Sequence, residues 1–224
     1  MNSHENREKP SSTLRMSEVY VSVQGESSYA GVPCVFIRLT GCNLRCSWCD
    51  SAYTFTGGDR RSVQSVVDEV LSHGIDLVEI TGGEPLLQAS VYPLMQALLE
   101  AGKTVLLETS GSLSIAKVPD QVVVILDFKP PGSGEVKANL WENVAQLKPH
   151  HEVKFVLASR EDYDWTREVI AEHQLEDRVT LLLSVVWGKL SFETLVQWML
   201  EDKLKARLNV QLHKVIWDPS ERGV

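Results

Sequence analysis

The chain has 224 residues, of which 43% are hydrophobic and 23% are charged, and its formal net charge is −8. These values are typical of a single globular domain, and the negative charge argues against nucleic-acid binding, which needs a basic face. No apolar run is long enough to span a membrane, so we expect a cytoplasmic protein without a membrane or nucleic-acid partner.

Apolar runs alternate with helical patterns after a polar start. Residues 1–15 carry no apolar signal segment, so we expect a flexible tail there and a single domain over residues 16–224. Period-two and continuous apolar runs predict strands at 34–39, 76–80, 104–107, 122–126, 153–157, 179–186 and 208–212. Helical periodicity and helix-ending glycines predict helices at 62–72, 91–101, 162–173 and 192–204.

Strands that alternate with helices predict an α/β fold with a mostly parallel sheet and helices outside. Seven strands fit a partial (β/α) barrel better than a complete eightfold one. Polar and glycine-rich segments follow the ends of these strands, at 42–50, 81–85, 108–111, 127–134 and around His213. Because the carboxyl ends of parallel strands share one edge, we expect these segments to meet at an active site.

Three cysteines, Cys42, Cys46 and Cys49, are spaced C-x3-C-x2-C on one short segment. Three thiolates grip one compact metal centre, and in a four-iron cluster they leave one iron open to another ligand. Disulfides are disfavoured because the chain has only four cysteines and no secretory signal. A structural zinc site remains an alternative, although Cys34 lies in a predicted strand and is expected to be a buried core thiol rather than a fourth ligand.

An open iron favours a ligand with both nitrogen and oxygen, such as the end of an amino acid. The segment 81–85 suits such a ligand, because Gly82 and Gly83 let the backbone approach closely and Glu84 can accept from an ammonium group. The alternative is a plain strand–turn–helix with Pro85 at the first helical position.

The cysteine spacing after one strand, followed by Gly-Gly-Glu after the next, resembles the radical S-adenosylmethionine superfamily. The resemblance implies that Cys42, Cys46 and Cys49 hold a [4Fe-4S] cluster. S-adenosylmethionine would then chelate the open iron and be cleaved by one electron to a 5′-deoxyadenosyl radical. Residues at the strand ends are expected to bind this cofactor: Gly82, Gly83, Glu84, Glu108, Ser110, Asp127, Lys129 and Ser133.

Further motifs narrow the resemblance to one family. They are Gln24-Gly25-Glu26, Phe36-Ile37-Arg38, Cys49-Asp50-Ser51, residues 127–134, residues 211–214 and residues 222–224. Together they resemble the 7-carboxy-7-deazaguanine synthases of the queuosine and deazapurine route. That family converts 6-carboxy-5,6,7,8-tetrahydropterin to 7-carboxy-7-deazaguanine with loss of ammonia, and it regenerates S-adenosylmethionine.

The resemblance implies roles for individual residues in substrate and metal binding. Arg38 is expected to hold the substrate carboxylate, and the other expected substrate-binding residues are Gln24, Glu26, Thr81 and His213. Ser51 is expected to bind Mg²⁺ through its hydroxyl, where many members have Thr. Ser27 replaces the second glycine of the usual QGEG, and Lys129 and Lys154 match basic positions of the family.

The family also implies partners: an electron donor such as a flavodoxin or ferredoxin, and a second copy of the chain in a homodimer. Two alternatives remain open from the sequence. One is another small radical enzyme, an activase that makes a glycyl radical in a partner protein. The other is a zinc-binding interaction module without catalysis.

Overall fold

The structure is a computed structural model that describes residues 12–219 and 221–224. Its strands are β1 (Thr13–Val23), β2 (Pro33–Leu39), β3 (Asp59–Ser62), β4 (Leu77–Gly82), β5 (Thr104–Thr109), β6 (Val123–Phe128), β7 (Glu152–Leu157), β8 (Thr180–Val185) and β9 (Arg207–Leu208). Its α-helices are α1 (Val63–Ser72), α2 (Val91–Glu100), α3 (Arg160–Glu172), α4 (Phe192–Glu201) and α5 (His213–Ile216).

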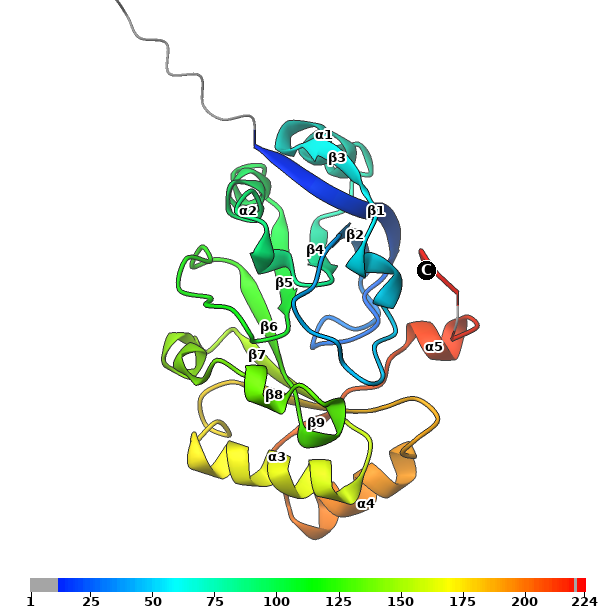
Figure 1. Ribbon diagram of the computed structural model, residues 1–224, viewed down its shortest axis with the longest axis vertical. Helices are drawn as coiled ribbons and strands as arrows, with labels where there is room; N and C mark the ends of the chain where they lie inside the picture. Colours follow the sequence, from blue (N-terminus) through cyan, green and yellow to red (C-terminus); the bar gives the residue numbers. More distant parts are fainter. Residues whose placement is uncertain (1–11, 220) are drawn as a thin grey trace, which may run out of the picture.

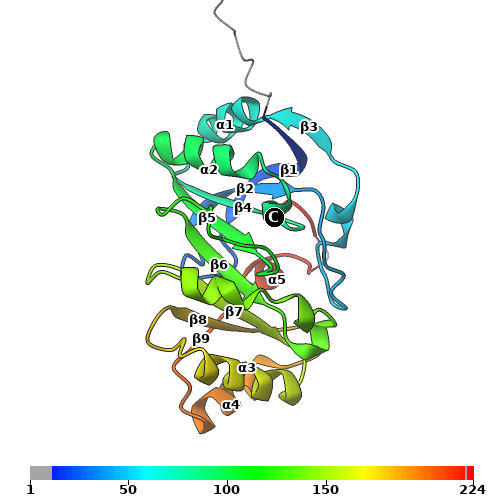
Figure 2. The same ribbon diagram turned by 60° about the vertical axis from the view of Figure 1, so that its left-hand side comes forward.

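The strands form one nine-stranded sheet in the order β3-β1-β2-β4-β5-β6-β7-β8-β9. Strand β2 and strands β4 to β9 run parallel, whereas β1 is antiparallel to both β2 and β3. Helices α1 to α4 lie along the outer side of the curved sheet, and α5 lies on the inner side (Figures 1 and 2). The expected α/β partial barrel with outer helices is confirmed.

Two strands were not predicted, and each has a physical reason. A register shift between Met16 and Glu18 breaks the alternation of β1, so its apolar residues do not follow one period-two pattern. Strand β3 reads Asp-Arg-Arg-Ser, the charged composition that protects an edge strand but gives no hydrophobic signal. Residues 13–15, assigned to the tail from sequence, therefore begin β1, and residues 1–11 lie outside the described residues.

The predicted helices are confirmed to within a few residues at each end. Three of them begin at a serine whose hydroxyl accepts a backbone N–H, namely Ser62, Ser159 and Ser191. The last predicted strand, 208–212, is mostly wrong because β9 has only two residues. Beyond it, the Asn209 N–H still donates to Leu183 O at 2.7 Å, but the chain then turns into α5.

Alternation along the parallel strands separates two apolar layers. In β4, Val78 and Ile80 pack outward among the helices, whereas Leu77 faces the inside of the barrel. Inside, the buried cluster comprises Cys34, Phe36, Leu77, Leu106, Val123, Ile125 and Leu182. Cys34 is therefore a buried core thiol, as expected. This layer fills the barrel toward the amino ends of its strands, which leaves the interior open toward the carboxyl edge.

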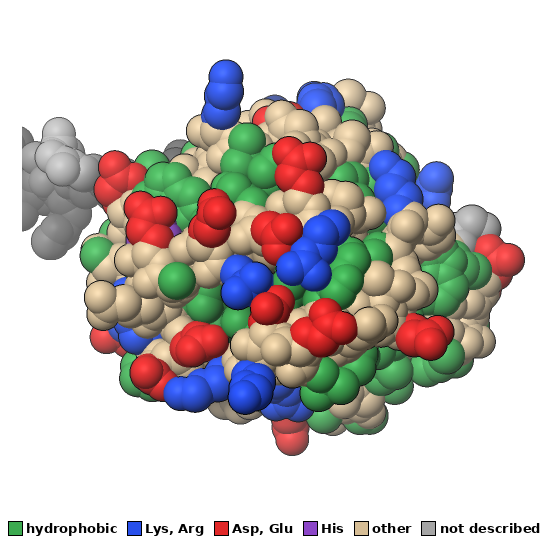
Figure 3. Space-filling model, turned by 90° about the horizontal axis from the view of Figure 1, so that it is seen from below, with side chains coloured by type: hydrophobic (Ala, Val, Ile, Leu, Met, Phe, Trp, Pro, Cys, Tyr) green, Lys and Arg blue, Asp and Glu red, His purple; other side chains and the backbone are tan. Residues whose placement is uncertain are grey.

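None of the helices in the described residues combines the length and apolarity needed to cross a bilayer. On the face that carries α3 and α4, Lys and Arg side chains lie among Asp and Glu side chains instead of forming one continuous basic patch (Figure 3).

Candidate active site

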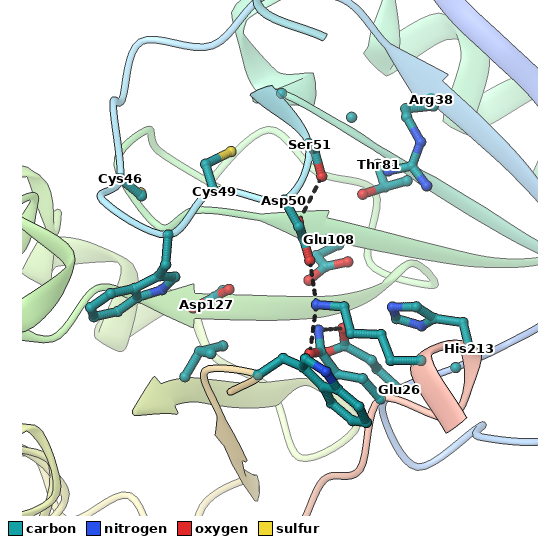
Figure 4. A pocket seen from close by; sticks show the side chains of 18 of the residues that line it. Glu26, Arg38, Cys46, Cys49, Asp50, Ser51, Thr81, Glu108, Asp127 and His213 are labelled. Carbon is teal, nitrogen blue, oxygen red and sulfur yellow. Dashed lines mark hydrogen bonds and ion pairs between the residues drawn. The ribbon is translucent and has the colours of Figure 1, made fainter. Parts of the chain in front are cut away.

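A cavity of about 680 Å³ opens at the carboxyl edge of the parallel strands. All five polar segments predicted to meet there contribute to its lining. Most of the site residues expected from sequence line it: Gln24, Glu26, Arg38, Cys42, Cys46, Cys49, Ser51, Thr81, Gly82, Gly83, Glu108, Ser110, Asp127, Lys129 and His213. Figure 4 labels ten of the lining residues that it draws, and they come from segments far apart in the sequence.

Gly82, the last residue of β4, and Gly83 after it bring this strand end against the cysteine segment. A Cβ on Gly83 would lie 2.1 Å from Gly41 O and 2.9 Å from the Cβ of Cys42. Gly82 has φ of +136°, and a Cβ there would lie 2.2 Å from Leu39 O. The Glu84 N–H donates to Gly41 O at 2.8 Å. The glycines thus allow two backbones to pack closely, and this fixes the position of Cys42.

The segment 127–135 holds the cysteine loop from its other side. The Ser47 N–H donates to Ser133 O at 2.9 Å, and the Ser47 hydroxyl donates to Gly132 O at 2.9 Å. Gly132 is in turn fixed by Asp162, a buried residue in the first turn of α3, which accepts its N–H at 2.7 Å. The cysteine loop is therefore braced by α3 through a carboxylate that sequence reasoning did not identify.

The three thiols of Cys42, Cys46 and Cys49 are partly exposed along the cavity wall. Burial raises the pKa of all three, for Cys46 to about 11, although the Lys129 charge acts in the opposite direction. Within the described residues, no three His, Cys, Asp or Glu side chains converge on a single metal position. Three thiols that line one cavity suit a four-iron cluster, which cysteine thiolates normally hold.

Glu84 and Ser133 occupy places different from those expected. The Glu84 carboxylate is fully buried and accepts from the Leu86 N–H at 3.0 Å, the Ser110 N–H at 2.8 Å and the Ser110 hydroxyl at 2.6 Å. Ser133 is also fully buried, and its hydroxyl donates to Pro130 O at 2.6 Å. Neither side chain is among the residues that line the cavity, and both form hydrogen bonds within its wall.

A buried ammonium group joins three carboxylates inside the cavity. Lys154 Nζ lies 2.8 Å from Glu26 Oε2, in contact with Glu108 Oε1, and 3.6 Å from Asp127 Oδ2. Burial lowers the pKa of Lys154, but the charges of Glu108, Glu26 and Asp127 outweigh it and raise the pKa well above its usual range. Lys154 therefore stays charged and holds together side chains from β5, β6 and the loop after β1.

The carboxylate of Glu26 is held in its charged form. Burial raises its pKa, but the Lys154 charge and a hydrogen bond from Gln211 Nε2 at 2.8 Å lower it to about 2. Asn209 Nδ2 donates to the other oxygen, Oε2, at 3.1 Å. Glu26 thus presents a fixed anion in the cavity, and residues 209–211 next to it come from the chain after β9.

The loop 24–32 enters the cavity from a different direction than the other segments. It follows β1, which runs against the parallel strands, and it meets the chain after β9 where the Leu212 N–H donates to Gly25 O at 2.9 Å. Gly25 is needed there because a Cβ would lie 2.4 Å from His213 Nδ1. Ser27 adopts φ of +64°, so the backbone keeps the left-handed conformation that glycine usually supplies.

Arg38, which is expected from sequence to hold the substrate carboxylate, makes an ion pair within the protein. Its Nε donates to Glu18 Oε1 at 2.8 Å, and its Nη2 donates to Tyr20 OH at 2.6 Å. Tyr53 OH donates to the same Glu18 oxygen at 2.7 Å. Glu18 was not identified from the sequence because the strand that carries it was not predicted. Arg38 therefore reaches the cavity with part of its hydrogen-bonding fork already occupied.

The hydroxyl proposed for Mg²⁺ lies beside a carboxylate. The Ser51 hydroxyl donates to Asp50 Oδ1 at 3.0 Å, and Asp50 Oδ2 lies 2.8 Å from Lys214 Nζ. Burial raises the pKa of Asp50, but the Lys214 charge and hydrogen bond lower it to about 2. The Ser51 hydroxyl and the Asp50 carboxylate are oxygen donors of the kind that Mg²⁺ takes, and Mg²⁺ usually keeps several water or substrate oxygens as well.

Two further groups line the cavity without having been assigned from sequence. Glu79 projects inward from β4, and the end of the chain lies at the opening, where the Arg222 guanidinium stands 4.2 Å from the centre of the Tyr53 ring. A period-two pattern identifies Glu79, because Leu77 and Thr81 on either side also face inward. No local pattern identifies the contact between the terminal segment and Tyr53.

Comparisons with known proteins agree with this architecture. Residues 36–127 match the Radical SAM superfamily. The 7-carboxy-7-deazaguanine synthase of Koribacter versatilis is 46% identical, with 94% of this chain and 100% of that protein covered. The synthase of the same name from Chlorobaculum tepidum is 41% identical, covering 94% and 97%. The crystal structure of QueE from Escherichia coli shares the fold, with a TM-score of 0.73, 21% identity and coverage of 89% and 94%.

Proposed function

The chain belongs to the 7-carboxy-7-deazaguanine synthase family of radical S-adenosylmethionine enzymes, and we propose that it converts 6-carboxy-5,6,7,8-tetrahydropterin to 7-carboxy-7-deazaguanine with loss of ammonia. One observation carries the proposal. A single cavity joins three cysteines of one loop to a cluster of fixed charges around Lys154 and to His213. Neither relative named above is described as a glycyl-radical activase or a zinc-binding module.

The family uses a [4Fe-4S] cluster and S-adenosylmethionine, which supply the radical chemistry when bound. Cys42, Cys46 and Cys49 would hold the cluster, with Gly83 keeping the loop in place. The cofactor side of the cavity is proposed to comprise Gly82, Gly83, Glu108, Ser110, Asp127 and Lys129. Supporting this, Asp127 lines the cavity, its Oδ2 lies 2.9 Å from Lys129 Nζ, and among the described residues its buried Oδ1 has no hydrogen-bond partner.

The substrate side is proposed to comprise Gln24, Glu26, Arg38, Thr81 and His213. Glu26 is charged and fixed by three donors, so it can accept from the N–H groups of a pterin edge without rearranging. Arg38 offers its remaining N–H groups to the substrate carboxylate. Its partner Glu18 orients the guanidinium but also weakens its net attraction for an anion.

Mg²⁺ is proposed to bind at the hydroxyl of Ser51, with Asp50 beside it and the remaining ligands supplied by substrate and water. A divalent cation near the substrate carboxylate would compensate for the charge that Glu18 removes from Arg38. Ser keeps the oxygen of the threonine found in many family members and lacks only its methyl group.

The remaining proposals concern location and partners. We propose a cytoplasmic enzyme that receives electrons from a flavodoxin or ferredoxin and acts as a homodimer. All four cysteines are free, as in a reducing compartment, and an oxygen-sensitive cluster is stable there. The partly exposed cysteine loop lies at the cavity wall, within reach of a reduced donor at the surface.

An anaerobic assay with reconstituted protein tests the function. The protein is supplied with the carboxy-tetrahydropterin, S-adenosylmethionine, Mg²⁺ and a reductant, and product and ammonia are measured. We expect turnover without net consumption of S-adenosylmethionine. Deoxyadenosine formation that depends on a protein partner instead of the pterin would contradict the proposal.

Cysteine variants test the ligand set in the same preparation. Replacing Cys42, Cys46 or Cys49 by Ala should abolish iron and sulfide binding. Cys34→Ala is the matched control, since Cys34 is fully buried among Phe36 and other apolar side chains. Equal loss of iron in the Cys34 variant would show that the ligand set is wrong.

A further inference from the structure

One acidic side chain lies in the apolar layer of the barrel. Glu79 is 3% exposed and pairs in register with Phe36 on β2 and Leu106 on β5, both members of the inner apolar cluster. Among the described residues, no lysine or arginine forms an ion pair with Glu79, whereas Glu26, Glu108 and Asp127 all reach Lys154. An apolar residue at this position would avoid the cost of burying a carboxyl group, so its contacts need an explanation.

The partner of Glu79 is the side-chain amide of Gln24. Gln24 Nε2 donates to Glu79 Oε2, and Gln24 Oε1 accepts from the Glu26 N–H at 3.0 Å. Gln24 is itself only 2% exposed. Its backbone N–H donates to Val32 O at 2.8 Å, and this bond joins the two ends of the loop 24–32. A continuous chain of hydrogen bonds thus leads from the barrel interior to the backbone of Glu26.

An amide group has two possible orientations that differ by exchange of its oxygen and nitrogen. Only one of them lets Gln24 accept from the Glu26 N–H, and Glu79 selects it by accepting from the amide nitrogen. Burial, followed by the Glu108 charge, raises the pKa of Glu79 well above its usual range. In either protonation state a carboxyl oxygen remains able to accept this bond.

We propose that Glu79 is a positioning residue for substrate binding, which orients the Gln24 amide and thereby sets the place of Glu26 in the cavity. The inference rests on the proposed function, since Glu26 is there assigned to the pterin. Without Glu79, the Gln24 amide loses its orientation, and the backbone before Glu26 gains freedom. The carboxylate would then have to be ordered by the substrate itself, which weakens binding without changing the reacting atoms.

Steady-state kinetics of three variants test this inference. Glu79→Leu should raise KM for the pterin about tenfold or more, because losing a hydrogen bond to a charged group costs a factor of that size. The kcat should stay within about threefold of wild type, because the reacting atoms are not changed. Glu79→Gln keeps an acceptor oxygen and should restore KM to within about threefold. Affinity for S-adenosylmethionine should be unchanged in both.

Glu152→Leu is the matched control, since Glu152 is another buried carboxylate that holds the same loop. It is 2% exposed and accepts from the Ser28 N–H at 3.2 Å, but it does not line the cavity. We expect its KM to stay within about threefold of wild type. An unchanged KM in Glu79→Leu, or an equal rise in Glu152→Leu, would overturn the proposed role, because the loop would then need anchoring but no amide orientation.

A measurement without turnover separates this inference from the function. Hydrogen exchange of the Gln24 side-chain amide, followed by NMR in the cofactor-free protein, should be slow in wild type and Glu152→Leu but fast in Glu79→Leu. Fast exchange in wild type would overturn the inference. Slow exchange together with no pterin turnover by wild type would support the Glu79 contact and count against the proposed function alone.

Discussion

Gly83 packs so closely against Cys42 that a Cβ on the glycine would lie 2.9 Å from the Cβ of the cysteine. The same Cβ would lie 2.1 Å from Gly41 O, so even the smallest side chain must displace the cysteine loop. We therefore predict that Gly83→Ala lowers iron affinity by about 10- to 100-fold, as for other residues that position metal ligands. Iron and sulfide content after anaerobic reconstitution measures this.

Gly57→Ala serves as the control for the Gly83 variant. Gly57 has φ of +84°, and a Cβ there would have no neighbouring atom within 4 Å, so Ala strains the backbone but displaces nothing. Its iron content should stay near that of wild type. Full iron loading of Gly83→Ala would show that the cysteine loop has enough freedom to move aside.

Arg38→Ala should weaken substrate binding while sparing the cofactor. Losing charge-assisted hydrogen bonds of about 1.5–3 kcal/mol corresponds to a rise in KM of roughly 10- to 100-fold. Pterin KM and S-adenosylmethionine affinity measure the two effects, and Arg60→Ala, an exposed arginine on β3, is the control. A pterin KM equal to that of wild type would rule out the carboxylate contact.

Variants at Ser27 should separate backbone strain from hydrogen bonding. Ser27 has φ of +64°, and its hydroxyl accepts from the Tyr29 N–H at 3.1 Å. Both Ser27→Gly and Ser27→Ala lose this bond. Only glycine relieves the strain of the left-handed backbone, which is about 1–2 kcal/mol. Glycine also lowers stability by about 0.4–1 kcal/mol, because it gives the unfolded chain more conformational freedom, so the relief of strain is the larger effect. Ser27→Gly should therefore unfold at higher denaturant concentration than Ser27→Ala, and the reverse order would show that the backbone there is not strained.

Stability should fall in acid through one buried histidine. Burial lowers the pKa of His151 to about 4 from an ordinary 6.5, and the neutral ring accepts from the Lys148 N–H at 3.3 Å. Because the folded pKa is depressed, the unfolded chain binds the proton first, and stability present above pH 6.5 is lost as the pH falls toward 4. Between pH 7 and 5 this loss is up to about 2 kcal/mol.

His151→Gln should remove most of that pH dependence, because glutamine does not titrate. Urea unfolding at pH 7 and at pH 5 compares the variant with wild type. His73→Gln, which changes an exposed histidine after α1, should retain the full dependence. If His151→Gln loses as much stability as wild type between the two pH values, the pH dependence of stability comes from other groups.

Local sequence patterns were sufficient to predict most of the helices and strands and to single out the cysteine loop. The amphipathic helices were predicted because their apolar spacing and the glycines that end some of them are encoded within about ten neighbouring residues. Strand β1 was missed because a bulge interrupts its alternation, and β9 was overextended because an apolar run does not show where pairing stops. The convergence of five segments followed from the common direction of parallel strands.

The contacts of Glu84, Ser133 and Arg38 could not be predicted from local sequence patterns. Each residue type suits a ligand. The partners of Glu84 and Arg38 come from distant segments, namely Thr109 and Ser110 for Glu84 and Glu18 for Arg38, whereas the Ser133 hydroxyl donates locally to Pro130 O. Asp162 illustrates the converse, since a residue that looks like an ordinary helix-start acid fixes the loop that braces the cysteines.

The sequence by itself determined the chemistry available to this protein, because three cysteines at fixed spacing and the polar groups after each strand are properties of the chain. Only the tertiary structure decided which of those groups face the cavity and which support its wall. The reason is that a buried polar side chain must find partners, and across a curved sheet those partners come from strands and loops that are remote in sequence.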